Sequence, residues 1–157
     1  MIKTVLFDFS HVVLLPNDRN CKGGLNELYK EKSKLAGFRF EDYFKLNTQL
    51  LNFLDTIKEK YELCVFTYGT IQEAAEVAST INKLFSRIFS EAYTGYSKEN
   101  PQSYLDIAKE LGKKPQEILF TDDKPKNVLA AKQAGLITIH FRSTKQFIAQ
   151  FQEMVKL

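Results

Sequence analysis

The sequence of 157 residues contains no tryptophan, four prolines and only two cysteines. Cys64 lies inside an apolar run and Cys21 in a polar loop, which favours two free thiols in a reducing cytoplasm over a disulfide or a cysteine metal site. The sequence also lacks an apolar run long enough to span a bilayer, and Met-Ile-Lys leads directly into an apolar segment rather than a signal peptide. We therefore expect a cytoplasmic protein with no membrane partner.

An excess of one charge is also missing, because 22 basic and 19 acidic residues leave a net charge of only +3. No stretch of lysine and arginine is dense enough to form a nucleic-acid footprint, so we expect no nucleic-acid partner. Hydrophobic residues make up 44% and charged residues 26%, which is ordinary for a globular protein. The length favours a single domain, residues 1–157, with at most a small insertion. The composition carries no signal for the oligomeric state.

Two apolar runs lead into carboxylates. The run that begins at Thr4 reaches Asp8, and the run that begins at Glu117 ends in Asp122 and Asp123. Runs of this kind are typical of buried strands in a parallel sheet, where ligands gather at the carboxyl ends of the strands. If the two strands are neighbours, three acidic side chains converge, and like charges repel there unless a cation lies among them.

Strand and helix patterns alternate along the rest of the chain. Apolar runs predict strands at 63–67, 87–93, 118–121 and 136–141, and amphipathic spacing predicts helices at 40–57, 70–85, 100–111, 125–134 and 143–155. This alternation predicts a layered α/β sheet with right-handed crossovers. A loop is expected after Val13, and residues from about 16 to 46 form an insertion that we expect to include a small helical cap.

Four features fall at or just beyond the strand ends: Asp8, Thr67, Lys98 and the pair Asp122–Asp123. Taken singly, each has an ordinary structural explanation, such as a turn cap, a strand residue or a surface lysine. Together they have a mechanism, because a carboxylate held by a cation and a lysine stays ionised and can attack phosphorus. The hydroxyl and amides of residues 67–70 can hold phosphate oxygens, and Mg²⁺ prefers carboxylates with a backbone carbonyl.

Four segments with these features resemble the motifs of the haloacid dehalogenase (HAD)-like hydrolase superfamily, most closely its phosphatase-like branch. They are Phe7–Val13, Val65–Thr70, Gly95–Pro101 and Ile118–Asn127, the last followed by Ala130-Ala131 and Ala134-Gly135. The fourth match is the most specific, and the four occur in the expected order over nearly the whole chain. The resemblance implies a Rossmann-like three-layer fold with a mainly parallel five-stranded sheet and a small cap between the first and second motifs.

The resemblance also implies a role for each matched residue. Asp8 would be the nucleophile that forms an aspartyl phosphate, and Lys98 would support it. Thr67, Tyr68, Gly69 and Lys98 would bind the phosphate. The metal ligands would be Asp8, the carbonyl of Ser10 and Asp122 directly, with Asp123 through water. The expected protein is a Mg²⁺-dependent phosphohydrolase acting on a phosphorylated small molecule or macromolecule.

One position departs from the resemblance, because Ser10 stands where the superfamily usually has a second Asp that protonates the leaving group. General acid–base help is worth about 10²–10⁴ in rate, so turnover is expected to be slow. His11 is a candidate replacement, although a residue next along a strand end usually points elsewhere, and we expect it to border the cap. His140 is expected to be structural.

Ser10 also keeps a second hypothesis open: a catalytically impaired HAD-like protein that binds a phosphorylated ligand or a protein partner. The short insertion suits an open site for a large or protein-borne phosphate, or a site that a partner chain completes. A dehalogenase needs no metal and is disfavoured by the acidic pair. A response-regulator receiver is disfavoured because its acidic pair follows the first strand, whereas Asp122 and Asp123 follow the fourth.

Overall fold

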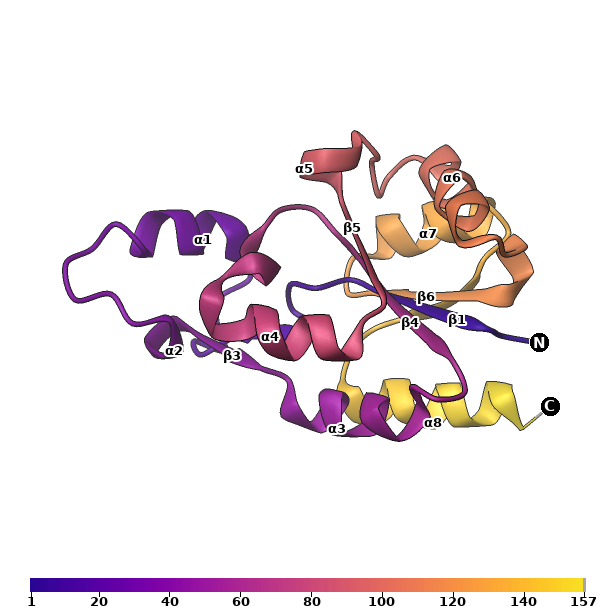
Figure 1. Ribbon diagram of the computed structural model, residues 1–157, viewed down its shortest axis with the longest axis horizontal. Helices are drawn as coiled ribbons and strands as arrows, with labels where there is room; N and C mark the ends of the chain where they lie inside the picture. The colour runs from indigo at the N-terminus through magenta and orange to yellow at the C-terminus, as the bar shows by residue number, and fades with distance from the viewer. Residues whose placement is uncertain (157) are drawn as a thin grey trace.

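A five-stranded parallel sheet forms the centre of the computed structural model, which describes residues 1–156 (Figure 1). The spatial order is β5-β4-β1-β6-β7, and every neighbouring pair is parallel. The strands are β1 (Thr4–Phe7), β4 (Glu62–Thr67), β5 (Arg87–Ser90), β6 (Ile118–Asp122) and β7 (Ile137–His140). The predicted α/β Rossmann-like fold with five strands is therefore confirmed.

Helices cover both faces of this sheet. Figure 1 shows α6 (Pro101–Leu111) and α7 (Pro125–Gln133) on one face, and α3 (Thr48–Ile57) and α8 (Thr144–Val155) on the other. Buried residues of α4 (Ala75–Leu84) belong to the same core as those of α3 and α8.

Side chains alternate across the central strand as its pleat requires. Val5 and Phe7 belong to the core shared with α3, α4 and α8, whereas Leu6 belongs to the core shared with α6 and α7. Burying a large apolar side chain contributes about 1.5–3 kcal/mol, so both faces of the sheet hold the layers together.

Capping residues are found at both ends of α6. The Asn100 side chain accepts a hydrogen bond from the amide of Gln102 at 3.0 Å, with Pro101 as the first helical residue of α6. Gly112 closes the same helix with φ of +64°, a conformation that glycine adopts without a steric penalty. These local signals set where α6 begins and ends.

The predicted helix over 40–57 is interrupted by a strand. The structure has a short helix α2 (Phe40–Tyr43), a strand β3 (Phe44–Leu46) and only then α3. The segment after Val13, expected to be a loop, forms β2 (Leu14–Pro16), which pairs with β3 as an antiparallel ribbon. The helical spacing was misleading because long-range pairing between β2 and β3 outweighs local propensity.

Two other boundaries also differ from the sequence patterns. The third strand ends at Ser90, and residues expected to extend it form α5 (Glu91–Thr94). The helix expected from Thr70 begins instead as the 3₁₀ turn η1 (Ile71–Glu73), and the Thr70 side chain makes no capping hydrogen bond. A second 3₁₀ turn, η2 (Pro115–Glu117), precedes β6.

The insertion lies beyond the carboxyl ends of the strands (Figure 1). It contains α1 (Leu25–Lys32), α2 and the ribbon that connects them to the sheet. Its role as a cap over residues of the sheet edge stays a prediction. Within residues 1–156, no helix combines the length and the hydropathy that a membrane span requires. Cys21 and Cys64 are both free.

Candidate active site

Neighbouring strands bring the acidic residues to one edge of the sheet. Phe7 of β1 pairs with Thr121 of β6, and the amide of Asp8 donates to the carbonyl of Thr121 at 2.9 Å. Asp122 therefore lies beside Asp8, and Asp123 follows directly. Carboxylate oxygens of Asp8, Asp122 and Asp123 all lie within 4.8 Å of one another.

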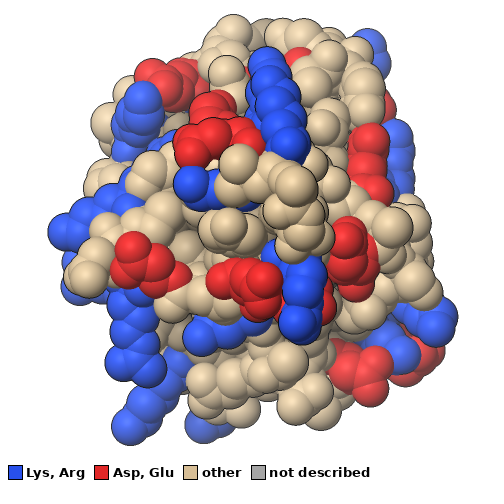
Figure 2. Space-filling view, turned by 90° about the vertical axis from the view of Figure 1, so that its left-hand side faces the viewer, with Lys and Arg blue, Asp and Glu red and all other residues tan. Residues whose placement is uncertain are grey.

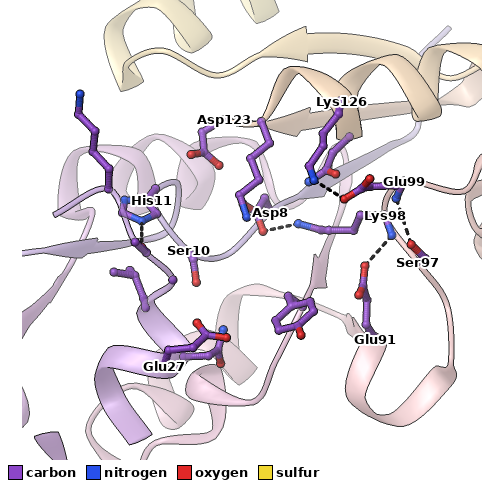
Figure 3. A pocket seen from close by; sticks show the side chains of 18 residues that line it. Asp8, Ser10, His11, Glu27, Glu91, Ser97, Lys98, Glu99, Asp123 and Lys126 are labelled. Carbon is purple, nitrogen blue, oxygen red and sulfur yellow. Dashed lines mark hydrogen bonds and ion pairs between the residues drawn. The ribbon is translucent and has the colours of Figure 1, made fainter. Parts of the chain in front are cut away.

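Lys98 completes this group, which we call the sheet-edge cluster: Asp8, Lys98, Asp122 and Asp123. The Lys98 ammonium donates to Asp122 Oδ2 at 2.8 Å. It also contacts Asp8 Oδ1 (Figure 3). Lys98 is only 5% exposed, although taken alone in the sequence it resembles a surface lysine. A buried lysine of this kind needs such partners, because an unpaired charge is costly away from water.

Backbone contacts hold Lys98 from both sides. Its amide donates to Glu91 Oε1 at 2.6 Å, and the hydroxyl of Tyr104 donates to its carbonyl at 2.7 Å. Tyr104 belongs to α6, so the helix that follows the Gly95–Asn100 loop also fixes the lysine backbone. The side chain can then reach the carboxylates with little loss of conformational freedom.

The two acids that end β6 have different surroundings. Asp122 is fully buried, and it accepts hydrogen bonds from the amide of Lys124 at 2.8 Å and from the side chain of Asn127 at 2.9 Å. The buried Asp123 Oδ1 has no hydrogen-bond partner in the part of the chain that the structure describes. His140 donates from its ring to the carbonyl of Asp123 at 2.9 Å. Asp122 is thus fixed in place, while a carboxylate oxygen of Asp123 stays available.

Burial raises the pKa of the Asp8 carboxyl to about 7, with Lys98 opposing this shift and Asp122 adding to it. The pKa of Asp123 is also raised, first by burial and then by Asp122. Burial lowers the pKa of Lys98, but the charges of Asp8 and Asp122 outweigh that effect and the net shift is upward. Asp8 and Asp122 therefore share one ammonium, with Asp123 close by, and an added cation would favour the ionised forms of all three carboxylates.

The donor set fits a hard divalent cation. Its side-chain donors are all carboxylate oxygens, which Mg²⁺ prefers, and no cysteine or histidine nitrogen belongs to the group. The unpartnered Asp123 oxygen also points to a ligand, because buried polar atoms usually have a partner. The residues of the sheet-edge cluster thus suit the Mg²⁺ site that the sequence predicts.

A cavity of about 440 Å³ opens over Asp8 and Lys98 (Figure 3). Ser10 lines it, and the Ser10 hydroxyl is buried without a hydrogen-bond partner among residues 1–156. His11 has φ of +63°, and its ring donates to the carbonyl of Gly23 at 2.8 Å. His11 therefore contacts the insertion, where the sequence placed it.

The loop after β4 is only partly open to this cavity. Thr67 is the last residue of β4 and is 1% exposed. Its buried hydroxyl has no hydrogen-bond partner in the described residues. Thr67 does not line the cavity. Tyr68 lines the cavity, whereas Gly69 lines a second, adjacent cavity of about 640 Å³. The amide of Thr70, expected to hold phosphate, donates instead to Asn26 Oδ1 at 3.0 Å.

Residues 22–27, which we call the α1 wall, face the sheet-edge cluster across the cavity. Asn26 and Glu27 belong to this wall and were not singled out from the sequence. Asn26 accepts hydrogen bonds from the amides of Thr70 and Ile71, both at 3.0 Å. These partners are 44 and 45 positions away along the chain, so no local pattern indicated them.

Lysines stand at the rim of the cavity. Lys22 of the insertion lines it. Lys126 also lines the cavity and contacts Glu99. Figure 2 shows the end of the molecule where the insertion lies, and basic and acidic side chains are interspersed across that face. An anion would therefore be bound by particular residues of the cavity and not by a broad positive surface.

Comparisons with known proteins agree with this geometry. A family model described as haloacid dehalogenase-like hydrolase matches residues 16–135, a range that begins after Asp8. An enolase-phosphatase E1 from Sulfurihydrogenibium sp. (strain YO3AOP1) is 33% identical over 114 residues, which are 69% of this chain and 46% of that protein. The chain spans less than half the length of the enolase-phosphatases that it matches.

Solved structures share the fold at low sequence identity. A predicted HAD-like family hydrolase from Porphyromonas gingivalis superposes with a TM-score of 0.74 at 18% identity, covering 100% of this chain and 99% of that one. A HAD family enzyme from Bacteroides thetaiotaomicron, crystallised with magnesium and inorganic phosphate, has a TM-score of 0.68 at 18% identity, covering 90% and 95%.

Proposed function

Because the chain belongs to the haloacid dehalogenase-like hydrolase family, we propose that it is a Mg²⁺-dependent phosphohydrolase that transfers the phosphoryl group of a phosphate monoester to Asp8. One observation carries this proposal. A buried ammonium, Lys98, contacts both Asp8 and Asp122 at the base of a cavity, within a group of three carboxylates. A packed core needs no such group, whereas phosphoryl transfer uses a nucleophile, a cation site and a fixed positive charge.

The reaction has two displacements at phosphorus. A carboxylate oxygen of Asp8 bonds to phosphorus, and the bond to the leaving-group oxygen breaks with its electron pair, so that this oxygen takes up a proton. Water then attacks the phosphorus of the aspartyl phosphate, which releases phosphate and restores the Asp8 carboxylate. Lys98 keeps Asp8 oriented and offsets the charge of the transferring group.

The cation would be held by Asp8, Asp122 and Asp123 together with the carbonyl of Ser10. When bound, it would supply positive charge to the phosphate oxygens. The Thr67 hydroxyl, the amides of Tyr68 and Gly69, and Lys98 would bind the other phosphate oxygens. The unpartnered Thr67 hydroxyl supports this assignment, because a buried hydroxyl without a partner suits a ligand.

As the substrate we propose a phosphorylated small molecule or an exposed phosphate on a macromolecule, with no nucleic-acid or membrane partner and a cytoplasmic location. Ser10 lines the cavity at the acid–base position, and a hydroxyl is not acidic enough to replace a carboxylic acid, so turnover is expected to be slow unless another side chain supplies that acid and base.

The test is hydrolysis of 4-nitrophenyl phosphate with and without Mg²⁺. The proposal expects turnover that needs Mg²⁺, is lost in Asp8→Asn and rises in Ser10→Asp. Asp55→Asn, an exposed carboxylate of α3, is the matched control and should behave as wild type. If neither wild type nor Ser10→Asp turns over while inorganic phosphate still binds, the protein is a phosphate-binding member of the family instead.

A further inference from the structure

Hydrolysis of an alkyl phosphate needs an acid and then a base. An alkoxide is a poor leaving group unless its oxygen receives a proton, and the attacking water must lose one. This inference rests on the proposed function and asks which side chain does that work. The carboxylates that line the cavity over Asp8 are those of Asp8, Glu27, Glu91, Glu99 and Asp123.

Four of these carboxylates already have another partner or role. Asp8 is the nucleophile, and Asp123 belongs to the sheet-edge cluster. Glu91 accepts the amide of Lys98 at 2.6 Å, and Glu99 contacts the ammonium of Lys126. Glu27 is different, because its side chain makes no hydrogen bond or ion pair with any residue between 1 and 156. Among the carboxylates that line this cavity, Glu27 is the one left without a partner or an assigned role.

The position of Glu27 suits the leaving-group oxygen. It lines both the cavity over Asp8 and the adjacent cavity of about 640 Å³, so it stands at the boundary between them. If the organic group of a phosphate bound over Asp8 occupies that second cavity, it extends past Glu27. Figure 3 shows Ser10 and Glu27 on the same side of the cavity, with the Ser10 hydroxyl directed toward the side where Glu27 lies.

Two glycines leave room for side chains of the α1 wall. A Cβ at residue 24 would meet the end of the Glu27 side chain, so Gly24 leaves open the space that this carboxylate occupies. The preceding residue, Asn26, fixes α1 through the amides of Thr70 and Ile71, and a Cβ at Gly69 would collide with its side chain. The helix that carries Glu27 is thus attached to the loop that follows Thr67.

We propose that Glu27 is the general acid and base of the reaction. As Asp8 bonds to phosphorus and the ester P–O bond breaks, the leaving oxygen receives the proton of the Glu27 carboxylic acid and departs as the alcohol. The Glu27 carboxylate then takes a proton from water as that water attacks the aspartyl phosphate. Phosphate and the Asp8 carboxylate are released, and Glu27 is protonated again.

The test compares two substrates whose leaving groups differ in their need for a proton. Ethyl phosphate needs protonation, whereas 4-nitrophenyl phosphate releases a stable phenolate. In Glu27→Gln with saturating Mg²⁺, kcat/KM for ethyl phosphate should fall by about 10²-fold or more, the typical worth of a general acid. For 4-nitrophenyl phosphate, kcat/KM should change by less than about threefold, because its leaving group needs no proton. Hydrolysis of the aspartyl phosphate would still lack its base, so kcat and KM should fall together and a burst of nitrophenolate should appear.

Glu31→Gln is the matched control, since Glu31 lies on the same helix and does not line the cavity. It should leave both substrates unaffected. An equal fall in kcat/KM for both substrates, or no change for either, would overturn the role of Glu27 while leaving the phosphohydrolase proposal in place. If wild type hydrolyses neither substrate, the proposed function fails and this inference fails with it.

Discussion

The sheet-edge cluster and the α1 wall face each other across one cavity but are built differently. Asp8, Lys98 and Asp122 are at most 5% exposed and follow directly from strand ends or from a loop held at several points. Lys22 and Glu27 of the wall are exposed, and Asn26 attaches α1 through two hydrogen bonds. The charged groups proposed to act on the phosphate are thus buried, whereas the side proposed to meet the leaving group presents exposed side chains.

The largest effect is expected from Asp8→Asn, which should abolish turnover because the nucleophile is gone. The same change should stabilise the metal-free protein at pH 8 by roughly 2–4 kcal/mol, since a tenfold change in the proton affinity of a carboxyl corresponds to about 1.36 kcal/mol. Chemical denaturation in the presence of EDTA, which keeps the protein free of metal, measures the free energy of unfolding of both proteins. A variant less stable than wild type at pH 8 would contradict the account.

The difference in stability between wild type and Asp8→Asn should depend on pH in one direction. The Asp8 pKa is raised from 3.8 to about 7 on folding, so the folded state keeps a proton that the unfolded state loses. Wild-type stability attributable to Asp8 is therefore full below pH 3.8 and is lost as the pH rises toward 7. The free energies of unfolding of wild type and Asp8→Asn should therefore be similar at pH 4 and differ by pH 7, as measured by chemical denaturation.

Lys98→Met should come next. It leaves Asp8 and Asp122 buried without their ammonium, and breaking a buried ion pair costs about 3–5 kcal/mol. Turnover should also fall below detection. Thermal or chemical unfolding would detect the loss, and Mg²⁺ should restore part of it by binding the carboxylates. Unchanged stability would mean that Lys98 does not neutralise this group.

Asn26→Ala tests the attachment of the α1 wall. Losing two hydrogen bonds of about 1 kcal/mol each should lower stability by about 1–2 kcal/mol. Amide hydrogen exchange at Thr70 and Ile71 should become faster, while exchange at the amide of Asp8 in the sheet stays unchanged. Equal acceleration at all three amides would show that the two sides of the cavity are not independent.

The smallest effect is expected from Lys126→Met. Lys126 contacts Glu99 at the rim, with side-chain exposures of 62% and 58%, and exposed pairs contribute about 0–1 kcal/mol. Unfolding measurements should therefore show a loss several times smaller than in Lys98→Met. Comparable losses in the two variants would remove the distinction between the buried and exposed sides of the cavity.

The sequence predicted the sheet well because its signals are local. Apolar runs that lead into Asp8 and Asp122 placed two neighbouring strand ends, and Asn100 with Gly112 marked both ends of a helix. The roles assigned to these acids and to Thr67 stay predictions. Failures occurred where distant segments pair: the β2–β3 ribbon interrupts a helical pattern, and Asn26 contacts a loop 44 residues away. Contacts of that kind depend on tertiary packing and leave no periodic trace in the sequence.

The most direct test of the central claim is to identify the residue that carries the phosphoryl group. The protein is incubated with acetyl phosphate and Mg²⁺, quenched in acid and analysed by peptide mass spectrometry, beside Asp8→Asn and the control Asp55→Asn. The account predicts one added phosphoryl group on Asp8 in wild type and Asp55→Asn, with none in Asp8→Asn. A phosphoryl group on another residue, or turnover that persists in Asp8→Asn, would contradict it.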